Sequence, residues 1–232
     1  MAEATFVDSF NNRKQLRLQS GEADRLSSRS YNLALTGLLA YGLLLNAVMV
    51  YYFAEPLRQM LIGVSSWVLL LGYLVPTLIG VLMAAKSTNP MVSFIGYNLV
   101  VLPIGVLLSL LLLGFPVGIV VKAMALTGMV TATMMLLAII RPQFFLGLGR
   151  TLFLTLIIGI VAEVVATWLL GYRGEIFDWV FVILFSGYIG YDVAKSQAYP
   201  KTLDNAVDSA LDIYLDIINL FIRLLSILGR RE

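Results

Sequence analysis

Long apolar runs separated by short polar segments make up most of the chain. A helix of about 20 apolar residues, rising about 1.5 Å per residue, crosses the roughly 30 Å hydrocarbon core of a bilayer. The uncharged stretch from Ser87 to Val121 is too long for one crossing, and Gly114-Phe115-Pro116 marks a turn within it. The pattern predicts seven helices, with the bounds Asn32–Phe53, Ile62–Ala85, Met91–Leu113, Pro116–Ile140, Thr151–Leu170, Ile176–Tyr191 and Asn205–Leu228.

Composition agrees with this pattern. The 232 residues are 59% hydrophobic and 13% charged, with a mean hydropathy of +0.89. A soluble domain is nearer to roughly half apolar and a quarter charged, so the bilayer must be the solvent for most of this chain. We predict an all-α membrane protein with one seven-helix transmembrane domain over residues 31–229, an N-terminal tail over residues 1–30 and a C-terminal tail over residues 230–232.

The N-terminal tail is polar and carries charges of both signs. It has no apolar run beside a small-residue cleavage site, so it does not resemble a signal peptide. We expect a flexible cytosolic tail, and a short amphipathic segment on the membrane surface is the alternative. The short tails and the lack of an organelle-targeting segment favour a bacterial plasma membrane.

The distribution of Lys and Arg predicts the orientation in the membrane. With the N-terminus inside, ten cations lie in cytoplasmic segments and four in outer ones; the inner set is Arg13, Lys14, Arg17, Arg25, Arg29, Lys86, Arg141, Arg150, Lys195 and Lys201, and the outer set is Arg58, Arg173, Arg230 and Arg231. We therefore expect a cytoplasmic N-terminus and, after seven crossings, an outer C-terminus. If the seventh helix re-enters the membrane instead of crossing it, the C-terminus lies inside.

The chain contains neither cysteine nor histidine. Their absence excludes disulfides, thiol nucleophiles, a Ser-His-Asp triad, and zinc or haem sites built on those ligands. Phosphate-binding loops of the forms GxxxxGK[ST] and GxGxxG are also missing. We therefore expect no enzyme, no cofactor and no nucleic-acid partner, and the bilayer is the first partner that the sequence implies.

The seventh predicted helix carries a narrow polar stripe. At about 100° per residue, its polar side chains fall within less than a quarter of the helix circumference. A carboxylate in the middle of the bilayer costs roughly 2.5–3.5 kcal/mol, so the stripe should face the bundle interior or a water-filled cavity. Acids in such places usually handle ions or protons. The stripe consists of Asp208, Asp212, Asp216, Asn219, Arg223 and Ser226.

Two simpler interpretations compete with an ion-handling role. The segment could be an amphipathic helix lying flat on the membrane, but such helices usually have a broad face rich in Lys and Arg. Alternatively, the acids could pair with interior cations such as Lys122 or Arg223 and only hold the bundle together. For Asp208, this structural role and a functional one are equally plausible.

Asp192 is a second acid of interest. The sixth run is short, and we expect Asp192 to close its helix at the cytoplasmic end, near the start of the seventh helix. Asp216 would then lie about two turns or more further into the membrane. Two carboxyl groups that come close together titrate as a coupled unit. Such a pair could hold a proton or bind a hard divalent cation through its oxygen atoms.

The segments around these two acids resemble a known family. Gly190-Tyr191-Asp192 and the segment Ala210–Phe221 (ALDIYLDIINLF) are similar to the C-terminal signature of the Bax inhibitor-1 family. The resemblance implies six helices around a central seventh, and bacterial members are pH-sensitive calcium leak channels. It also implies that Asp192 and Asp216 form a hydrogen-bonded pair that senses protons. Calcium and protons are then the transported or bound species.

The resemblance implies a further basic residue. In the family, a cation near the end of the second helix pairs with the first aspartate as a latch, and here that position falls on Lys86. A flanking lysine that reaches to the membrane interface is the alternative for Lys86. Glu163 in the fifth run should face inward and is a further candidate carboxylate on a cation pathway.

The expected function is therefore a pH-sensitive calcium leak channel of the cell membrane. The alternative is a non-conducting membrane regulator that binds quality-control proteases or stress and cell-death partners, as the resemblance also implies for some members. Intramembrane proteolysis by aspartates would need a Gly-x-Gly-Asp motif, whereas Asp192 follows Gly190-Tyr191.

Overall fold

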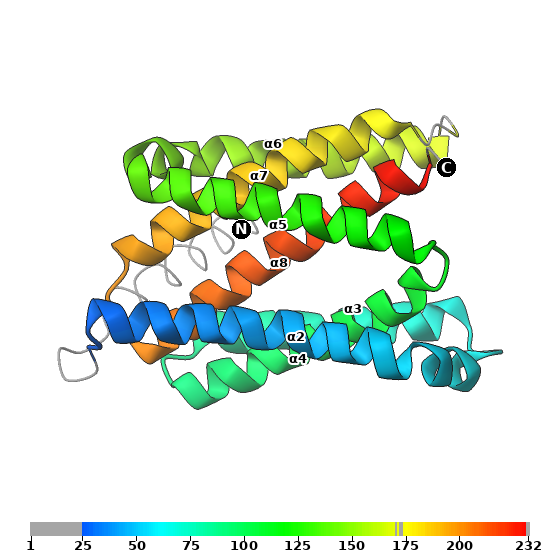
Figure 1. The fold of residues 1–232 in the computed structure, drawn as a ribbon, viewed down its shortest axis with the longest axis horizontal. Helices are drawn as coiled ribbons and strands as arrows, with labels where there is room; N and C mark the ends of the chain where they lie inside the picture. Colours follow the sequence, from blue (N-terminus) through cyan, green and yellow to red (C-terminus); the bar gives the residue numbers. More distant parts are fainter. Residues whose placement is uncertain (1–24, 170, 172–173, 231–232) are drawn as a thin grey trace, which may run out of the picture. The chain divides into compact units, whose positions relative to one another are not determined.

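The computed structural model describes residues 25–169, 171 and 174–230, and these residues fold into seven α-helices (Figure 1). This confirms the predicted all-α fold, and no strand occurs in the described part of the chain. Six of the predicted starts and five of the predicted ends lie within about four residues of the observed ones. The helices are α2 (Ser28–Leu61), α3 (Ser66–Lys86), α4 (Pro90–Leu112), α5 (Val117–Ile140), α6 (Pro142–Leu169), α7 (Glu175–Ala198) and α8 (Leu203–Gly229).

Capping groups and prolines explain where several helices begin. The Ser27 hydroxyl accepts a hydrogen bond from the Ser30 amide at the start of α2, and Asn89 caps α4 with Pro90 as its first residue. The turn predicted at residues 114–116 separates α4 from α5. Gly63 has a φ of +82° in the turn between α2 and α3, a conformation that favours glycine.

The predicted end of the sixth helix is wrong. Helix α7 does not stop at Tyr191 but continues to Ala198, so Asp192 lies inside the helix. The charge does not end the helix because the Lys195 ammonium, one turn later, lies 2.7 Å from the Asp192 carboxylate. The helix ends two residues before Pro200, which disfavours helical backbone at the residue before it.

Two other predicted bounds are also corrected. Helix α2 continues past Phe53 to Leu61, and α6 begins at Pro142 and not at Thr151. Both extensions contain charged residues, which a search for uncharged runs excludes although they are good helix formers. At the N-terminus, residues 1–24 of the predicted tail lie outside the described residues, and α2 already begins within the remainder of that tail.

Six helices, α2 to α7, are long and apolar enough to cross a membrane. Their large apolar side chains are exposed in great number, as expected for surfaces that contact lipid. The chain is therefore a multi-pass membrane protein. Helix α8 has the length for a crossing, but its body carries more charge than the other helices.

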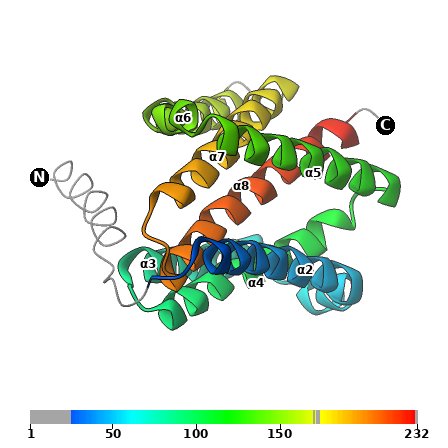
Figure 2. The ribbon, with the colours of Figure 1, turned by 60° about the vertical axis from the view of Figure 1, so that its left-hand side comes forward.

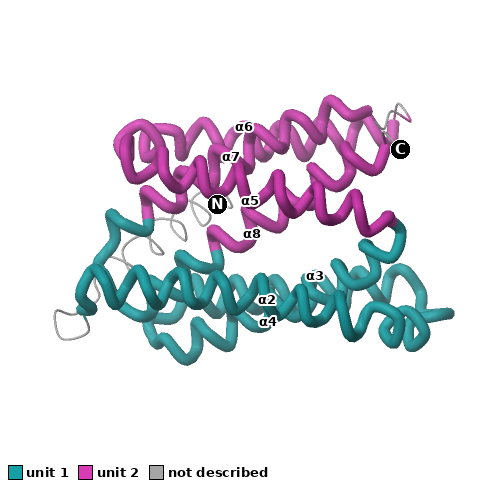
Figure 3. Tube along the Cα trace, in the orientation of Figure 1, with its two compact units in different colours: residues 1–114, 196–211 teal, residues 115–195, 212–232 magenta. Residues whose placement is uncertain are grey.

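Backbone contacts divide the chain into two compact units (Figure 3). Unit 1 comprises the residues up to Gly114 together with Ser196–Leu211, and unit 2 comprises Phe115–Lys195 together with the residues from Asp212 onward. Helix α8 belongs to both units, since its first third lies in unit 1 and the remainder in unit 2. Whether residues 31–229 behave as one domain stays a prediction.

In unit 1, α4 packs against both α2 and α3 (Figures 1 and 2). The Tyr31 hydroxyl donates a hydrogen bond of 3.0 Å to the Ser196 carbonyl, which fixes the start of α2 to the last turn of α7. The Ser93 hydroxyl donates a hydrogen bond of 2.6 Å to the Asp204 carboxylate and so joins α4 to the first turn of α8. In unit 2, α5 packs against α6.

Helix α8 is enclosed by protein. Among its 27 residues, only Leu203 and Asn219 are exposed. This burial agrees with the expected central position of the last helix. It also means that the charged groups of α8 must find their partners on neighbouring helices.

We predict that Gly96→Ala destabilises the packing of α3 against α4. A Cβ atom at Gly96 would come within 2.6 Å of the Gly80 carbonyl oxygen and 3.1 Å of the Ala84 nitrogen, so backbone would have to move. Overpacking of this kind costs about 1–3 kcal/mol and should lower the unfolding temperature in detergent. Gly72→Ala in α3 is the control, since a Cβ atom there meets nothing within 4 Å. Equal unfolding temperatures for the two variants would contradict the prediction.

Candidate functional site

Four residues of the polar stripe of α8, Asp212, Asp216, Arg223 and Ser226, contact other helices of unit 2. Asp212 contacts Lys195 of α7, and Asp216 contacts Asp192 of α7. Two turns further along, Arg223 and Ser226 both contact Asp178 at the start of α7. The order of these contacts shows that α7 and α8 run antiparallel. Two separate groups of charged side chains result, one near each end of this part of α8.

The first group is the acidic pair, defined as Asp192 and Asp216. Their carboxyl groups lie within hydrogen-bonding contact of each other, and each residue is only 7% exposed. The Oδ2 atom of Asp216 is buried without a hydrogen-bond partner among the described residues. Because an ionised carboxylate can only accept, two carboxyl groups share a hydrogen bond only if one carries a proton. A hydrogen bond between Asp192 and Asp216 therefore requires a proton on at least one of the two carboxyl groups.

Lys195 is the cation of the acidic pair, and the sequence analysis missed it. Its ammonium group lies 2.7 Å from Asp192 Oδ1 and 3.2 Å from Asp212 Oδ2, and 5.3 Å from the centroid of the Tyr191 ring. The Asp-x-x-Lys spacing was a usable signal, since residues three apart on a helix are neighbours. The signal was lost because the predicted helix ended before Lys195.

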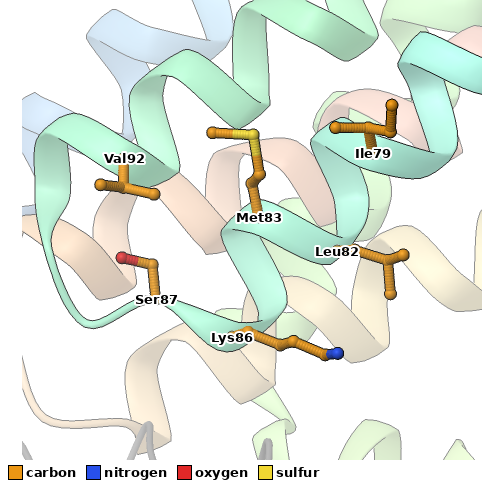
Figure 4. Close-up of a pocket in the computed structure, with 6 residues that line it drawn as sticks. All are labelled: Ile79, Leu82, Met83, Lys86, Ser87 and Val92. Atoms are coloured by element: carbon orange, nitrogen blue, oxygen red, sulfur yellow. The ribbon is translucent and has the colours of Figure 1, made fainter.

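Lys86, the predicted latch, is the last residue of α3 in unit 1 and is exposed. It lies on a shallow groove of about 420 Å³, and in Figure 4 its side chain extends away from Ser87 and Val92. The groove is lined by Ile79, Leu82, Met83, Lys86, Ser87 and Val92, and none of these is an acid that could bind a cation. A contact of Lys86 with Asp192 would join the two units and stays a prediction.

Two further predicted residues lie apart from the acidic pair. Asp208 is 2% exposed and belongs to unit 1, so it is in neither charged group of unit 2. Asn219 lies between the two groups along α8 and is exposed, and its amide donates a hydrogen bond of 2.8 Å to the Leu215 carbonyl of its own helix. Their predicted roles on a cation pathway stay predictions.

The second group is the arginine cluster, defined as Arg223, Glu163, Asp178, Ser226 and Arg230. Arg223 donates from both terminal nitrogens to the two Glu163 oxygens, at 2.6 and 2.8 Å. The first of these nitrogens also donates to Asp178 Oδ1 at 2.9 Å, and Ser226 and Arg230 contact Asp178 Oδ2 at 2.9 and 3.0 Å.

The arginine cluster bears on the simpler interpretation that the interior acids only pair with cations and hold the bundle together. Arg223 does pair with interior acids, but its partners are Glu163 of α6 and Asp178 of α7 and not the acids of its own stripe. Glu163 and Arg223 were both candidates from the sequence, whereas Asp178 and Arg230 were not. Asp178 was overlooked because a single acid near a helix start is ordinary in sequence.

Comparison with known proteins gives consistent matches over most of the chain. The family model described as "Inhibitor of apoptosis-promoting Bax1" matches residues 27–232. The inner membrane protein YbhL of Escherichia coli is 26% identical over 224 residues, which cover 90% of this chain and 94% of YbhL. An uncharacterised membrane protein of Streptococcus pyogenes is 28% identical over 200 residues, covering 82% of this chain and 79% of that protein.

We predict that Lys195→Met destabilises the protein by about 3 kcal/mol, because it leaves two largely buried carboxylates without their cation. The loss should shrink as the pH falls, since protonation removes the negative charges that the ammonium neutralises. Thermal unfolding in detergent between about pH 5 and 8 measures both effects. Arg150→Met, which removes an exposed cation of α6, should change stability by no more than about 0.5 kcal/mol. A loss that is constant with pH would contradict the assignment.

Proposed function

The chain belongs to the Bax inhibitor-1 family, and from this premise we propose that it is a pH-sensitive calcium leak channel of the cell membrane. The observation that carries the proposal is the acidic pair. Asp192 and Asp216 are buried in a membrane protein and in contact with each other, and Asp216 Oδ2 has no hydrogen-bond partner among the described residues. Intramembrane acids are costly, and they typically mark ion or proton pathways.

The carboxyl groups of the acidic pair suit weak, transient binding of a cation. Calcium is a hard cation that prefers carboxylate oxygens. In the described part of the chain, no group of three or more acidic side chains is arranged to hold a metal ion. Two carboxyl groups alone bind calcium weakly, and conduction requires weak binding so that the ion can leave.

The proton state of the pair supplies the gate. With one proton, the Asp192 and Asp216 carboxyl groups share a hydrogen bond and hold α7 and α8 together. Without it, two like charges about 4 Å apart repel by about 4 kcal/mol at an effective dielectric constant of 20. The charged and titratable groups that the structure describes around the pair are Lys195, Asp212, Tyr188 and Tyr191, and of these only Lys195 carries a positive charge.

We predict that calcium flux into proteoliposomes, measured between about pH 6 and 8, changes with pH because the coupled carboxyl pair exchanges a proton. Asp192→Asn and Asp216→Asn should each abolish this pH dependence, because an amide cannot take part in the proton exchange. Glu55→Gln, which removes an exposed acid of α2, should leave the dependence intact. A wild-type pH response in both aspartate variants would reject the gating role.

A non-conducting regulator is the second candidate. Its support is that Lys195 and Arg223 compensate the interior acids, which a purely structural role for these charges also explains. The flux experiment separates the two candidates. Folded protein without calcium flux at any pH, in the wild type and in every variant, favours the regulator.

We also propose a cytoplasmic N-terminus, from the bias of Lys and Arg toward the segments on that side. The chain has no cysteine, so single cysteines report position without background. Ser65→Cys, between α2 and α3, should react with an impermeant maleimide on intact cells. Thr88→Cys, between α3 and α4, should react only after the membrane is permeabilised. The reverse pattern would invert the topology.

A further inference from the structure

The arginine cluster has no part in the proton gate, yet it lies on the same polar stripe. Arg223 follows Asp216 by seven residues on α8, which corresponds to about 10 Å along the helix axis. On α7, Asp178 precedes Asp192 by 14 residues, or about 21 Å. Asn219, the stripe residue between the two groups, is exposed. A cation that follows the stripe from the acidic pair toward the C-terminal end of α8 therefore meets the arginine cluster next.

The guanidinium group of Arg223 is held in a built site. Its central carbon lies 4.2 Å from the centroid of the Phe181 ring, and Phe181 is 1% exposed. Gly159 of α6 leaves room for this ring, since a Cβ atom at that position would lie 3.1 Å from it. The ring face and the two carboxylates together fix the plane of the guanidinium. A lysine ammonium group has no such plane, so the site is shaped for arginine.

The charges in the cluster balance without a proton or a metal ion. Glu163 and Asp178 supply two negative charges, and Arg223 and Arg230 supply two positive ones. Arginine does not lose its proton in proteins, so both guanidinium groups keep their positive charge at physiological pH. The acidic pair differs in this respect, because its charge changes with a single proton.

We propose that Arg223 is a tethered cation that occupies the carboxylates of Glu163 and Asp178 and thereby closes the calcium path at the C-terminal end of α8. The proposal rests on the proposed channel function. A covalently attached guanidinium is present at a high effective concentration and excludes calcium from these carboxylates. Opening of this end then requires that Arg223 moves away from them, whereas opening at the acidic pair requires a change of proton state.

The test uses the full-length protein in two measurements, calcium flux in proteoliposomes and thermal unfolding in detergent with and without calcium chloride. Arg223→Gln should raise the flux several-fold at every pH, and calcium should now raise its unfolding temperature. The double variant Glu163→Gln/Arg223→Gln should lose both effects. Arg58→Gln is the control, since it breaks an exposed Arg–Glu pair of similar geometry and should change neither measurement.

A chemical rescue separates an occluding role from a structural one. Millimolar guanidinium chloride, far below denaturing concentrations, should bind the carboxylates vacated in Arg223→Gln and reduce its flux toward the wild-type value. It should not affect the wild type, whose site is already filled. If Arg223 only holds the helices together, added guanidinium leaves the flux of the variant unchanged, and that result would overturn the proposal.

The remaining outcomes also decide the matter. A folded Arg223→Gln protein with wild-type flux, beside aspartate variants that lose their pH response, refutes the occlusion and leaves the channel function intact. If no variant conducts, the channel function fails. The unfolding temperature of Arg223→Gln then decides on the cation site: a rise with calcium chloride supports a site at the carboxylates, and no rise refutes it. Should Arg223→Gln not fold, Arg223→Lys still supplies a tethered cation, so flux near the wild-type value is expected in that variant, and a several-fold rise at every pH counts against the proposal.

Discussion

The cost of removing charge from water governs how α8 is held. The helix is enclosed on nearly all sides, yet it carries acids, an arginine and hydroxyl groups along one stripe. Each buried charge costs several kcal/mol unless it is paired and hydrogen-bonded. Helices α6 and α7 provide the partners in unit 2, at Glu163, Asp178, Asp192 and Lys195. The register between α7 and α8 thus follows from charge pairing at both ends and not only from apolar packing.

The two groups of charges satisfy this requirement to different degrees. In the arginine cluster, positive and negative charges are equal in number, and the Arg223 guanidinium donates three hydrogen bonds to the two carboxylates. Around the acidic pair, three carboxyl groups (Asp192, Asp212 and Asp216) share one ammonium group. The deficit of positive charge can be met by a proton or by a passing cation. The two groups therefore differ in how completely their charges are compensated, and the different functions proposed for them rest on this difference.

The sequence predicted those features that depend on a single helix, such as its bounds and the face that carries its polar residues. The periodicity of the last helix placed its polar residues on one face, and its predicted bounds differ from the observed ones by only one or two residues. The predicted end of α7 is wrong because a single charge does not stop a helix when a cation compensates it, and Lys195 compensates Asp192 one turn later. That single error also hid Lys195 as a partner of the acidic pair.

Partners on different helices could not be paired from the sequence. Glu163 and Arg223 were both visible as interior charges, but 60 positions separate them, and only the packing of α6 against α8 brings them together. Asp178 and Phe181 complete that site because α7 turns this face toward α8. The pattern of polar residues in α8 does not specify which face of α7 it will meet. The Asp192–Asp216 contact was anticipated because a family motif carries it, and not because the spacing of these residues requires it.

The way in which α8 is anchored limits how the acidic pair can respond to a lost proton. Its first turn is tied to Ser93 through Asp204, and its later turns are tied to α6 and α7 through Arg223. Sliding of the whole helix would break both sets of hydrogen bonds at once. Lys195, in contrast, already spans Asp192 and Asp212 on a flexible side chain. The least costly first response is therefore a shift of its ammonium group toward the newly charged carboxylate, and movement of α7 against α8 follows only if that shift does not balance the charge.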